Sequence, residues 1–330
     1  MNFIIYLLNW YEKNQRKFPW RNTRNPYQIW VSEIIFQQTR INQGYEYFLN
    51  FIDKFPDIQT LAAASEDEVL HVWQGLGYYS RAHNLHFSAK FVCSELHGNF
   101  PDSYEKILQL KGIGGYTAAA IASIAFGERV PAIDGNAFRV YSRIFNSERD
   151  ISKTRTFNYF FHLMKPLMPE NAGDFNQAVM DLGAMICLPT NPKCEICPIQ
   201  TECIAFCAKN QQNLPVKSSN LVIKTVSLHY VFVTDSQNFL AKKRSQSGIW
   251  KGLYEFPEMN DDFRQKKNVE IRNLTHKLTH RILDITISKI EVKSRQLQHF
   301  ALAENCLIIP VNERKNYAFP KPLENFLIVI

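Results

Sequence analysis

The chain has 330 residues, a length typical of about two domains, and its 45% hydrophobic content is enough for buried cores and excludes a disordered composition. The formal net charge of +7 is compatible with an anionic partner such as nucleic acid, although many enzymes are as basic. No segment approaches the roughly 18 apolar residues of a membrane span, and the amino terminus lacks the basic start and the cleavage site of a signal peptide. We therefore expect a soluble, intracellular protein.

Up to about residue 209 the sequence predicts one helix after another. In PYQIWVSEIIF (26–36) the apolar residues recur at the spacing of one buried helix face. The same spacing recurs in the segments 40–52, 65–73, 80–96, 116–126, 137–145, 156–167 and 175–186. The first part of the chain is therefore expected to be all-α.

The rest of the chain has a different pattern. NQQNLPVKSSN (210–220) is polar and contains a proline, so residues 210–222 are predicted to be a linker. In KTVSLHYVFVTD (224–235) apolar residues alternate with a period of two, which favours a strand. Further strands are favoured in the segments FLAKKR, KLTHRILDITISKIEV, NCLIIPVN and ENFLIVI. Residues 223–330 are therefore predicted to form an α+β domain that ends in a closing strand.

A glycine-rich turn precedes one of the predicted helices, in KGIGGYTAAAI (111–121). Gly112 and Gly114 allow the positive φ angles and the close backbone approach that a tight turn needs. The unpaired N–H groups of the following helix are suited to a phosphate. The alternative is a glycine-rich corner between two helices that binds nothing.

Four of the seven cysteines lie within CLPTNPKCEICPIQTEC (187–203). An odd total without a secretory signal disfavours a disulfide framework. Thiolates this close together can hold one metal centre. A structural zinc is one alternative, but such sites usually use two C-x2-4-C pairs, and only one pair here has that spacing.

The arrangement C-x6-C-x2-C-x5-C at the end of a helical domain resembles the 4Fe-4S signature of the endonuclease III and MutY superfamily of DNA glycosylases. The resemblance implies one 4Fe-4S cluster, held by Cys187, Cys194, Cys197 and Cys203. LKGIGGYTAA resembles the hairpin of that superfamily's helix-hairpin-helix motif. It implies that the DNA backbone contacts the hairpin and the helix start, at Gly112, Ile113, Gly114 and Thr117.

Tyr116 separates two branches of the superfamily. The bifunctional endonuclease III branch carries a lysine at this place, and its amine attacks the sugar and leads to strand cleavage. A phenol cannot form a Schiff base. The resemblance therefore implies a monofunctional enzyme, which removes the base and leaves the backbone intact.

Two carboxylates fit the chemistry of base removal, which needs an acid for the leaving base and a negative charge beside the cationic sugar. Glu33 lies among apolar residues of its predicted helix, so we expect a raised pKa that suits a general acid. The alternative is an exposed surface glutamate. Asp134 precedes a predicted helix, and we expect the helix dipole to keep its carboxylate ionised and its pKa low. Its alternative role is a simple N-cap.

The segments SEIIFQQT (32–39) and DGNAFRV (134–140) resemble the adenine-specific MutY branch. That resemblance implies that Glu33 protonates adenine at N7 and that Asp134 stabilises the sugar cation, with Tyr116 and Asn136 beside it. The scissile bond is inaccessible inside a duplex, so the base must be extruded. The resemblance assigns DNA contacts to Gln38 and Thr39 of that segment, to Tyr78 of GLGYYSR as an intercalating ring, and to Arg21 of FPWR near the adenine pocket.

SGIWKGLYEFPEM (247–259) resembles the MutT-like domain at the carboxyl end of MutY proteins. The glutamate array of true Nudix hydrolases does not follow it, which disfavours pyrophosphate hydrolysis. In the MutY family this domain recognises 8-oxoguanine through a Phe-Ser-His loop, which corresponds here to Leu278, Thr279 and His280. Thr279 keeps the hydroxyl of serine, whereas Leu278 loses the aromatic surface. The alternative is that these are ordinary residues at the start of a strand.

The sequence thus predicts a multi-domain protein: an all-α helix-hairpin-helix glycosylase domain with an iron–sulfur cluster, followed by an α+β MutT/Nudix-like domain. We expect residues 1–209 to comprise a six-helix region (about 25–133) and a cluster region (1–24 with 134–209), with DNA bound in the cleft between them. The predicted activity is removal of adenine opposite 8-oxoguanine or guanine in double-stranded DNA. The protein is expected to be monomeric, cytoplasmic and nucleoid-associated.

Three alternatives are weighed against this prediction. A bifunctional lyase that acts on oxidised pyrimidines is disfavoured by Tyr116 and by the second domain. A non-catalytic DNA-binding or redox-sensing iron–sulfur protein is disfavoured because Glu33 and Asp134 are both present. A nucleotide pyrophosphohydrolase would need the absent glutamates.

Overall fold

The computed structural model describes residues 2–218, 223–244, 248–260, 270–278 and 280–329. The chain divides into two compact units, and each unit is made of two stretches of sequence. The first unit comprises Met1–Ala62 and Phe87–Ser219, and the second comprises Ala63–His86 and Asn220–Ile330. None of the helices in the described ranges has the length and apolar character that a membrane crossing requires.

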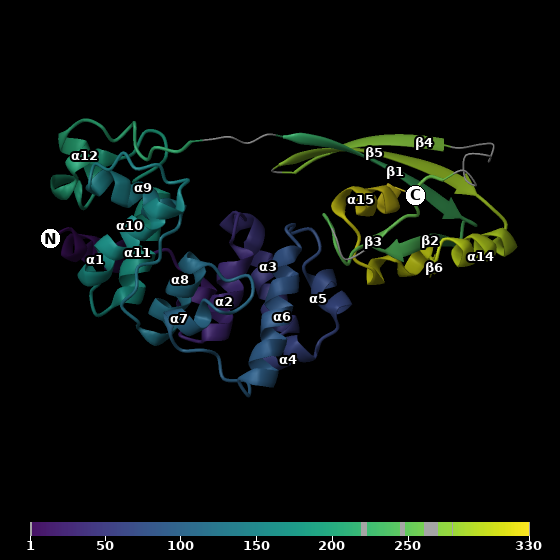
Figure 1. The fold of residues 1–330 in the computed structure, drawn as a ribbon, viewed down its shortest axis with the longest axis horizontal. Helices are drawn as coiled ribbons and strands as arrows, with labels where there is room; N and C mark the ends of the chain where they lie inside the picture. The colour runs from purple at the N-terminus through teal and green to yellow at the C-terminus, as the bar shows by residue number, and fades with distance from the viewer. Residues whose placement is uncertain (1, 219–222, 245–247, 261–269, 279, 330) are drawn as a thin grey trace. The chain divides into compact units, whose positions relative to one another are not determined.

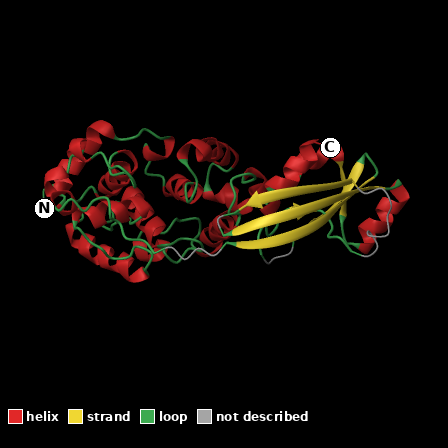
Figure 2. Cartoon of the chain, turned by 90° about the horizontal axis from the view of Figure 1, so that it is seen from above, coloured by secondary structure: helices red, strands yellow, loops and turns green. Residues whose placement is uncertain are grey.

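The first unit is helical, as predicted (Figures 1 and 2). Helix α6 (Ser80–Glu95) runs from the second unit into the first. The other helices of the first unit are α1 (Phe3–Asn14), α2 (Pro26–Ile35), α3 (Ile41–Lys54), α4 (Ile58–Ala63), α7 (Tyr104–Ile107), α8 (Gly115–Phe126), α9 (Gly135–Ile144), α10 (Thr154–Met164), α11 (Ala172–Met185) and α12 (Ile204–Cys207).

Local sequence explains where the helices of the later site begin and end. Asn25 caps α2 by accepting hydrogen bonds from two backbone N–H groups of the first turn, and Pro26 occupies the first helical position. Asp134 caps α9 by accepting a hydrogen bond from the backbone N–H of Ala137. Helix α8 ends at Gly127, whose φ of +71° is the left-handed conformation that glycine adopts without strain.

Helix α11 is the centre of the first unit. It packs against α1, α8 and α9, while α8 also packs against α2. The core around it is rich in large side chains, among them Phe3, Tyr141, Phe160 and Phe175, each at most 1% exposed. Helices α2, α8, α9 and α11 are thus fixed relative to one another, and these four carry the residues of the candidate site.

The second unit contains α5 (Glu66–Val72) and a six-stranded mixed sheet. The strand order is β3-β2-β1-β5-β4, with β6 paired to β2. Only the β1–β5 pairing is parallel among the described strands. The strands are β1 (Lys224–Thr234), β2 (Asn238–Lys243), β3 (Tyr254–Glu255), β4 (Glu270–Lys277), β5 (Arg281–Glu291) and β6 (Leu307–Pro310).

Helices cover both faces of this sheet near β1. Val231 and Val233 form a core with Leu297 of α14 (Ser294–Ala303). Phe232 lies between those two valines in the sequence and contacts Phe326 of α15 (Lys321–Val329), with ring centroids 5.3 Å apart. Because successive side chains of a strand point to opposite faces, α14 and α15 cover opposite faces.

The predicted closing strand in ENFLIVI (324–330) was wrong, because the structure forms helix α15 there. The buried residues Leu323, Phe326 and Leu327 have helical spacing and line one side of the helix. A short continuous apolar run does not distinguish a buried strand from a buried helix by periodicity alone. The proline and glutamate just upstream suit a helix start.

Part of the segment expected to be a linker packs against the helical unit. Leu214 is only 2% exposed. The backbone N–H of Ile151 donates to the Val216 carbonyl at 3.0 Å, and the Ser218 hydroxyl donates to Asp150 at 2.6 Å. The covered apolar side chain and these bonds hold residues 214–218 in place.

We predict that Gly173→Ala destabilises the helical unit by about 1–3 kcal/mol, because α11 and α8 approach too closely there for a side chain. A Cβ atom at position 173 would lie 2.9 Å from the carbonyl oxygen of Ser123 and 3.0 Å from the Cα of Ile124. Thermal unfolding followed by circular dichroism would measure the loss. Gly135→Ala is the matched control, because a Cβ at that helix start meets nothing within 4 Å. Equal melting temperatures for the two variants would contradict the close approach.

Candidate active site

A cleft of about 1000 Å³ opens on the first unit, lined by residues of α2, α8, α9 and α11 and of the short turn Pro19–Arg21. It brings together many of the residues that the sequence analysis selected. These are Arg21, Glu33, Gln38, Thr39, Gly114, Tyr116, Thr117, Asp134 and Asn136. The cleft therefore joins segments that are about 100 residues apart in the chain, such as those of Glu33 and Asp134.

The carboxyl of Glu33 on α2 is bonded to Tyr116 on α8. The Tyr116 hydroxyl donates to the Glu33 Oε2 at 2.6 Å. Burial raises the pKa of Glu33 to about 7, and the nearby charge of Asp134 adds to that rise. The bond from Tyr116 and the charge of Arg21 oppose it. Glu33 can therefore carry a proton near neutral pH, as the sequence analysis expected.

A second hydrogen bond joins the segment after α2 to α8 and helps to fix the two helices relative to each other. The Gln37 side chain, just beyond the end of α2, donates to the Thr117 hydroxyl in the first turn of α8 at 3.1 Å. Burial raises the pKa of Tyr116 well above its ordinary value, so its phenol stays protonated and acts as a donor.

Asp134 caps α9 and faces the same cleft. Its Oδ1 accepts a hydrogen bond from the Ala137 backbone N–H at 2.7 Å, and its Oδ2 accepts one from the Asn136 side chain at 2.7 Å. The expected low pKa was wrong in direction: burial raises the pKa of Asp134, and the bonds from Ala137 and Asn136 only partly offset that rise. Desolvation of the carboxylate outweighs the helix terminus because the side chain is enclosed.

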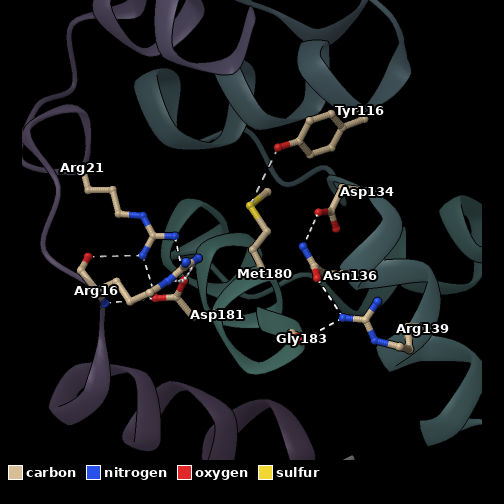
Figure 3. Close-up of polar contacts among 9 residues, drawn as sticks. All are labelled: Arg16, Arg21, Tyr116, Asp134, Asn136, Arg139, Met180, Asp181 and Gly183. Atoms are coloured by element: carbon tan, nitrogen blue, oxygen red, sulfur yellow. Dashed lines mark hydrogen bonds and ion pairs between the residues drawn. The ribbon is translucent and has the colours of Figure 1, made fainter. Parts of the chain in front are cut away.

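Asn136 connects Asp134 to Arg139 through hydrogen bonds (Figure 3). Its carboxamide oxygen accepts a bond from Arg139 at 2.8 Å. Arg139 also donates to the carbonyl oxygens of Gly183 at 2.7 Å and Cys187 at 2.6 Å. A continuous set of hydrogen bonds thus runs from the Asp134 carboxylate to the backbone of the first cysteine.

Asp181 on α11 does not line the cleft but binds an arginine that does, and the sequence analysis missed it. It accepts two bonds from Arg21, at 2.6 and 2.8 Å, and the Arg16 side chain approaches the same carboxylate to 2.6 Å (Figure 3). Burial raises the pKa of Asp181, but the two guanidinium groups outweigh burial and hold this pKa below its usual range. The only sequence signal was a single acid in the largely apolar NQAVMDLGAM.

Arg21, which was predicted to contact DNA, is bound to another residue of the protein. Its guanidinium lines the cleft and forms a bidentate pair with the Asp181 carboxylate. Arg21 therefore holds the turn Pro19–Arg21 against α11 and places Trp20 in the wall of the cleft.

The glycine turn has the predicted positive φ at Gly112 but not at Gly114, whose φ of −99° is an extended conformation. Gly112 adopts a φ of +83°, and Gly114 caps α8 without a side chain of its own. A Cβ at Gly114 would meet nothing within 4 Å, so the space before the helix start is open. Ile113 points inward and is only 8% exposed, so it can offer a ligand only backbone atoms. Gln38, which also lines the cleft, has a φ of +57°.

The four predicted metal ligands line one small cavity of about 20 Å³. They are Cys187, Cys194, Cys197 and Cys203. The buried Arg143 donates to the Cys187 sulfur at 3.2 Å and to the carbonyl oxygens of Leu188 at 2.7 Å and Leu214 at 3.0 Å. One guanidinium thus joins α9, the loop after the first cysteine and the packed end of the linker.

Comparisons with known proteins show the family of the chain. Residues 31–166 match the model of the HhH-GPD superfamily of base excision DNA repair proteins, and residues 229–328 match that of the NUDIX domain. The chain is 34% identical to the adenine DNA glycosylase of Buchnera aphidicola subsp. Acyrthosiphon pisum, across 98% of this chain and 96% of that protein. The chain belongs to the adenine DNA glycosylases.

Solved structures support the fold of this glycosylase's helical part. A thermostable thymine-DNA glycosylase is similar with a TM-score of 0.58 and 30% identity, over 62% of this chain and 95% of that one. Endonuclease III in a non-covalent complex with DNA is similar with a TM-score of 0.53 and 17% identity, over 62% of this chain and 94% of that one. The predicted helix-hairpin-helix domain followed by a Nudix-like domain is therefore confirmed.

The remaining predicted contacts of the glycosylase belong to its second unit. Tyr78 is 42% exposed and has a φ of +49°, and the Arg81 guanidinium lies 5.6 Å from the centre of its ring. Leu278 and His280 lie in the turn between β4 and β5, where the Leu278 N–H donates to the Arg281 carbonyl at 2.8 Å. Thr279 lies outside the described residues.

We predict that Asp181→Asn destabilises the helical unit by about 3–5 kcal/mol, because it leaves two partly buried guanidinium groups without a counter-charge. The Asp181 side chain is fully buried, and that of Arg21 is 9% exposed. Urea unfolding would measure the change. In the control Asp102→Asn, the pair with Lys106 is 65% exposed on both sides and we expect no measurable change. Equal unfolding midpoints for the two variants would show that the buried ion group is dispensable.

Proposed function

We propose that this glycosylase hydrolyses the N-glycosidic bond of adenine mispaired with 8-oxoguanine or guanine in duplex DNA and leaves the DNA backbone intact. The bond between Tyr116 and Glu33, in a cleft shared with Asp134, is the observation that carries the proposal. It pairs a carboxyl that is protonated near neutral pH with a second carboxylate on a different helix. That combination is the one that departure of a base from a sugar requires.

The proposed chemistry assigns one task to each carboxyl group. The proton of Glu33 passes to N7 of the extruded adenine while the bond between C1′ and the base breaks, so the bonding electrons leave with a neutral base. The Asp134 carboxylate, held by Ala137 and Asn136, stabilises the positive charge on the sugar. Water then adds to C1′ and gives its proton to the Glu33 carboxylate, which restores the starting state.

The cleft supports a monofunctional reaction. Among residues 2–218, no lysine is part of the lining. The place where a lysine would form a Schiff base is taken by Tyr116, whose hydroxyl is bonded to Glu33. A bifunctional lyase would need an amine in reach of C1′.

We further propose that the four cysteines hold a 4Fe-4S cluster. They line one cavity, yet within the described residues no three His, Cys, Asp or Glu side chains are close enough to hold one metal ion. Thiolates are the usual ligands of iron–sulfur clusters, and the four cysteines contain only one of the two short C-x2-4-C pairs that a zinc site usually uses. When bound, the cluster would supply four thiolate bonds that fix this segment of the chain.

Three parts of the protein are proposed to contact the DNA. The open helix start at Gly114 would hold a backbone phosphate, and Gln38 and Thr39 would enter the duplex beside the extruded base. Leu278 and His280, in the turn between β4 and β5, would contact the base opposite adenine, together with Thr279, which lies outside the described residues.

We predict that Glu33→Gln lowers the single-turnover rate about 10²- to 10⁴-fold, because an amide cannot donate the proton. The substrate is a duplex with one adenine opposite 8-oxoguanine, analysed with and without alkali. The control Glu12→Gln removes an exposed carboxylate on α1 and should leave the rate unchanged.

For the wild-type protein we expect strand breaks only after alkali treatment. Breaks without alkali would contradict the monofunctional assignment. An unchanged rate in Glu33→Gln would overturn its role as the acid. Equal rates for adenine opposite 8-oxoguanine and opposite thymine would overturn the proposed substrate.

A further inference from the structure

The segment that leads into Asp134 is buried without being part of a helix or strand. Val130, Ala132 and Ile133 are each at most 2% exposed, and they lie in the connection from α8 to α9. Buried backbone N–H and C=O groups need partners, and this stretch has no ladder to supply them. The position of Asp134 therefore depends on what satisfies these groups.

The side chain of Asn176 on α11 supplies the missing partners. Its Oδ1 accepts a hydrogen bond from the Ala132 N–H at 3.0 Å, and its Nδ2 donates to the Val130 carbonyl at 2.9 Å. The second N–H of the same amide donates to the Ser123 hydroxyl on α8 at 2.8 Å. Asn176 is fully buried, and its carboxamide takes the place of a neighbouring strand.

The close packing of α11 against α8 positions the Asn176 amide for these hydrogen bonds. Gly173, one turn earlier on α11, lets the helix come close to the Ser123 carbonyl. The Ser123 hydroxyl donates in turn to the Ala120 carbonyl at 3.2 Å. The amide of Asn176 is thus held by α8 on one side and by the Val130–Ala132 stretch on the other.

Helix α11 also contacts the residues that follow Asp134 in the sequence. A Cβ at Gly183 would lie 2.5 Å from the Cβ of Asn136, and the Gly183 carbonyl accepts a bond from Arg139. Helix α11 therefore holds the backbone two residues before Asp134 through Asn176 and the residue two positions after it through Gly183. Asn176 lies outside the residues that line the cleft.

We propose that Asn176 is a positioning residue, which sets the distance between the Asp134 carboxylate and the reacting sugar through the backbone of Val130 and Ala132. The inference rests on the proposed role of Asp134. Misplacement of a catalytic group by about 1 Å can cost on the order of 10²-fold in rate. Loss of this amide should therefore affect the chemical step and leave DNA binding intact.

We predict that Asn176→Asp lowers the single-turnover rate about 10- to 100-fold, because it keeps the size and the acceptor but replaces the amide donors. Its affinity for a duplex with a non-hydrolysable adenosine analogue should stay within about twofold of wild type. The basic limb of its pH–rate profile, assigned to Glu33, should stay in place. Ser123→Ala removes one partner of the same amide and should give a smaller loss in the same direction.

Thr156→Val is the matched control for stability. Its buried hydroxyl makes one hydrogen bond, to the Asp150 carbonyl at 2.7 Å, and it too is absent from the cleft lining. Rates are compared at temperatures equally far below each melting point. A rate loss in Asn176→Asp no larger than in Thr156→Val would overturn the inference, as would a parallel loss of DNA affinity.

Asp134→Asn separates this inference from the one on which it rests. If Asp134→Asn keeps the wild-type rate, the proposed role of Asp134 fails and the positioning role fails with it. If Asp134→Asn is inactive while both Asn176→Asp and Ser123→Ala keep the wild-type rate, only the positioning role is overturned. Loss of rate in all three supports both.

Discussion

The hydrogen bond from Tyr116 to the Glu33 carboxyl is the interaction on which the account of this glycosylase depends. It joins the helix that carries the proposed acid to the helix that starts at the glycine turn, so the acid and the open helix start are fixed together. Burial of Glu33 raises its pKa, and the phenol limits that rise to about 7. A carboxyl free in water would be ionised at neutral pH and could not donate a proton to a base.

Helix α11 supports the rest of the site although it holds none of the proposed catalytic residues. Asp181 on this helix binds the two arginines that fix the Pro19–Arg21 turn. Gly183 leaves room for Asn136, and Asn176 bonds the stretch before Asp134. The packing of one buried helix thus positions two separate segments of the cleft lining, and a change there is expected to alter catalysis without any contact with DNA.

Sequence predicted the parts of the site that depend on local pattern. The helix of Glu33, the cap at Asp134 and the turn at Gly112 follow from periodicity, from capping preference and from the φ angle that glycine allows. What sequence missed depends on tertiary contacts. Asp181 is one acid in a helix until folding brings two arginines to it. The pKa of Asp134 was predicted in the wrong direction because enclosure of a side chain is not visible in its neighbours along the chain.

The most direct test of the central claim is the pH dependence of the single-turnover rate, for wild type and for Tyr116→Phe. Because Glu33 acts in its protonated form, the wild-type rate should fall about tenfold per pH unit above a pH of about 7. The bond from Tyr116 lowers the pKa of Glu33, so its removal should move this basic limb to higher pH. A wild-type rate that is unchanged from pH 6 to 9, or a limb that moves to lower pH in Tyr116→Phe, would contradict the account.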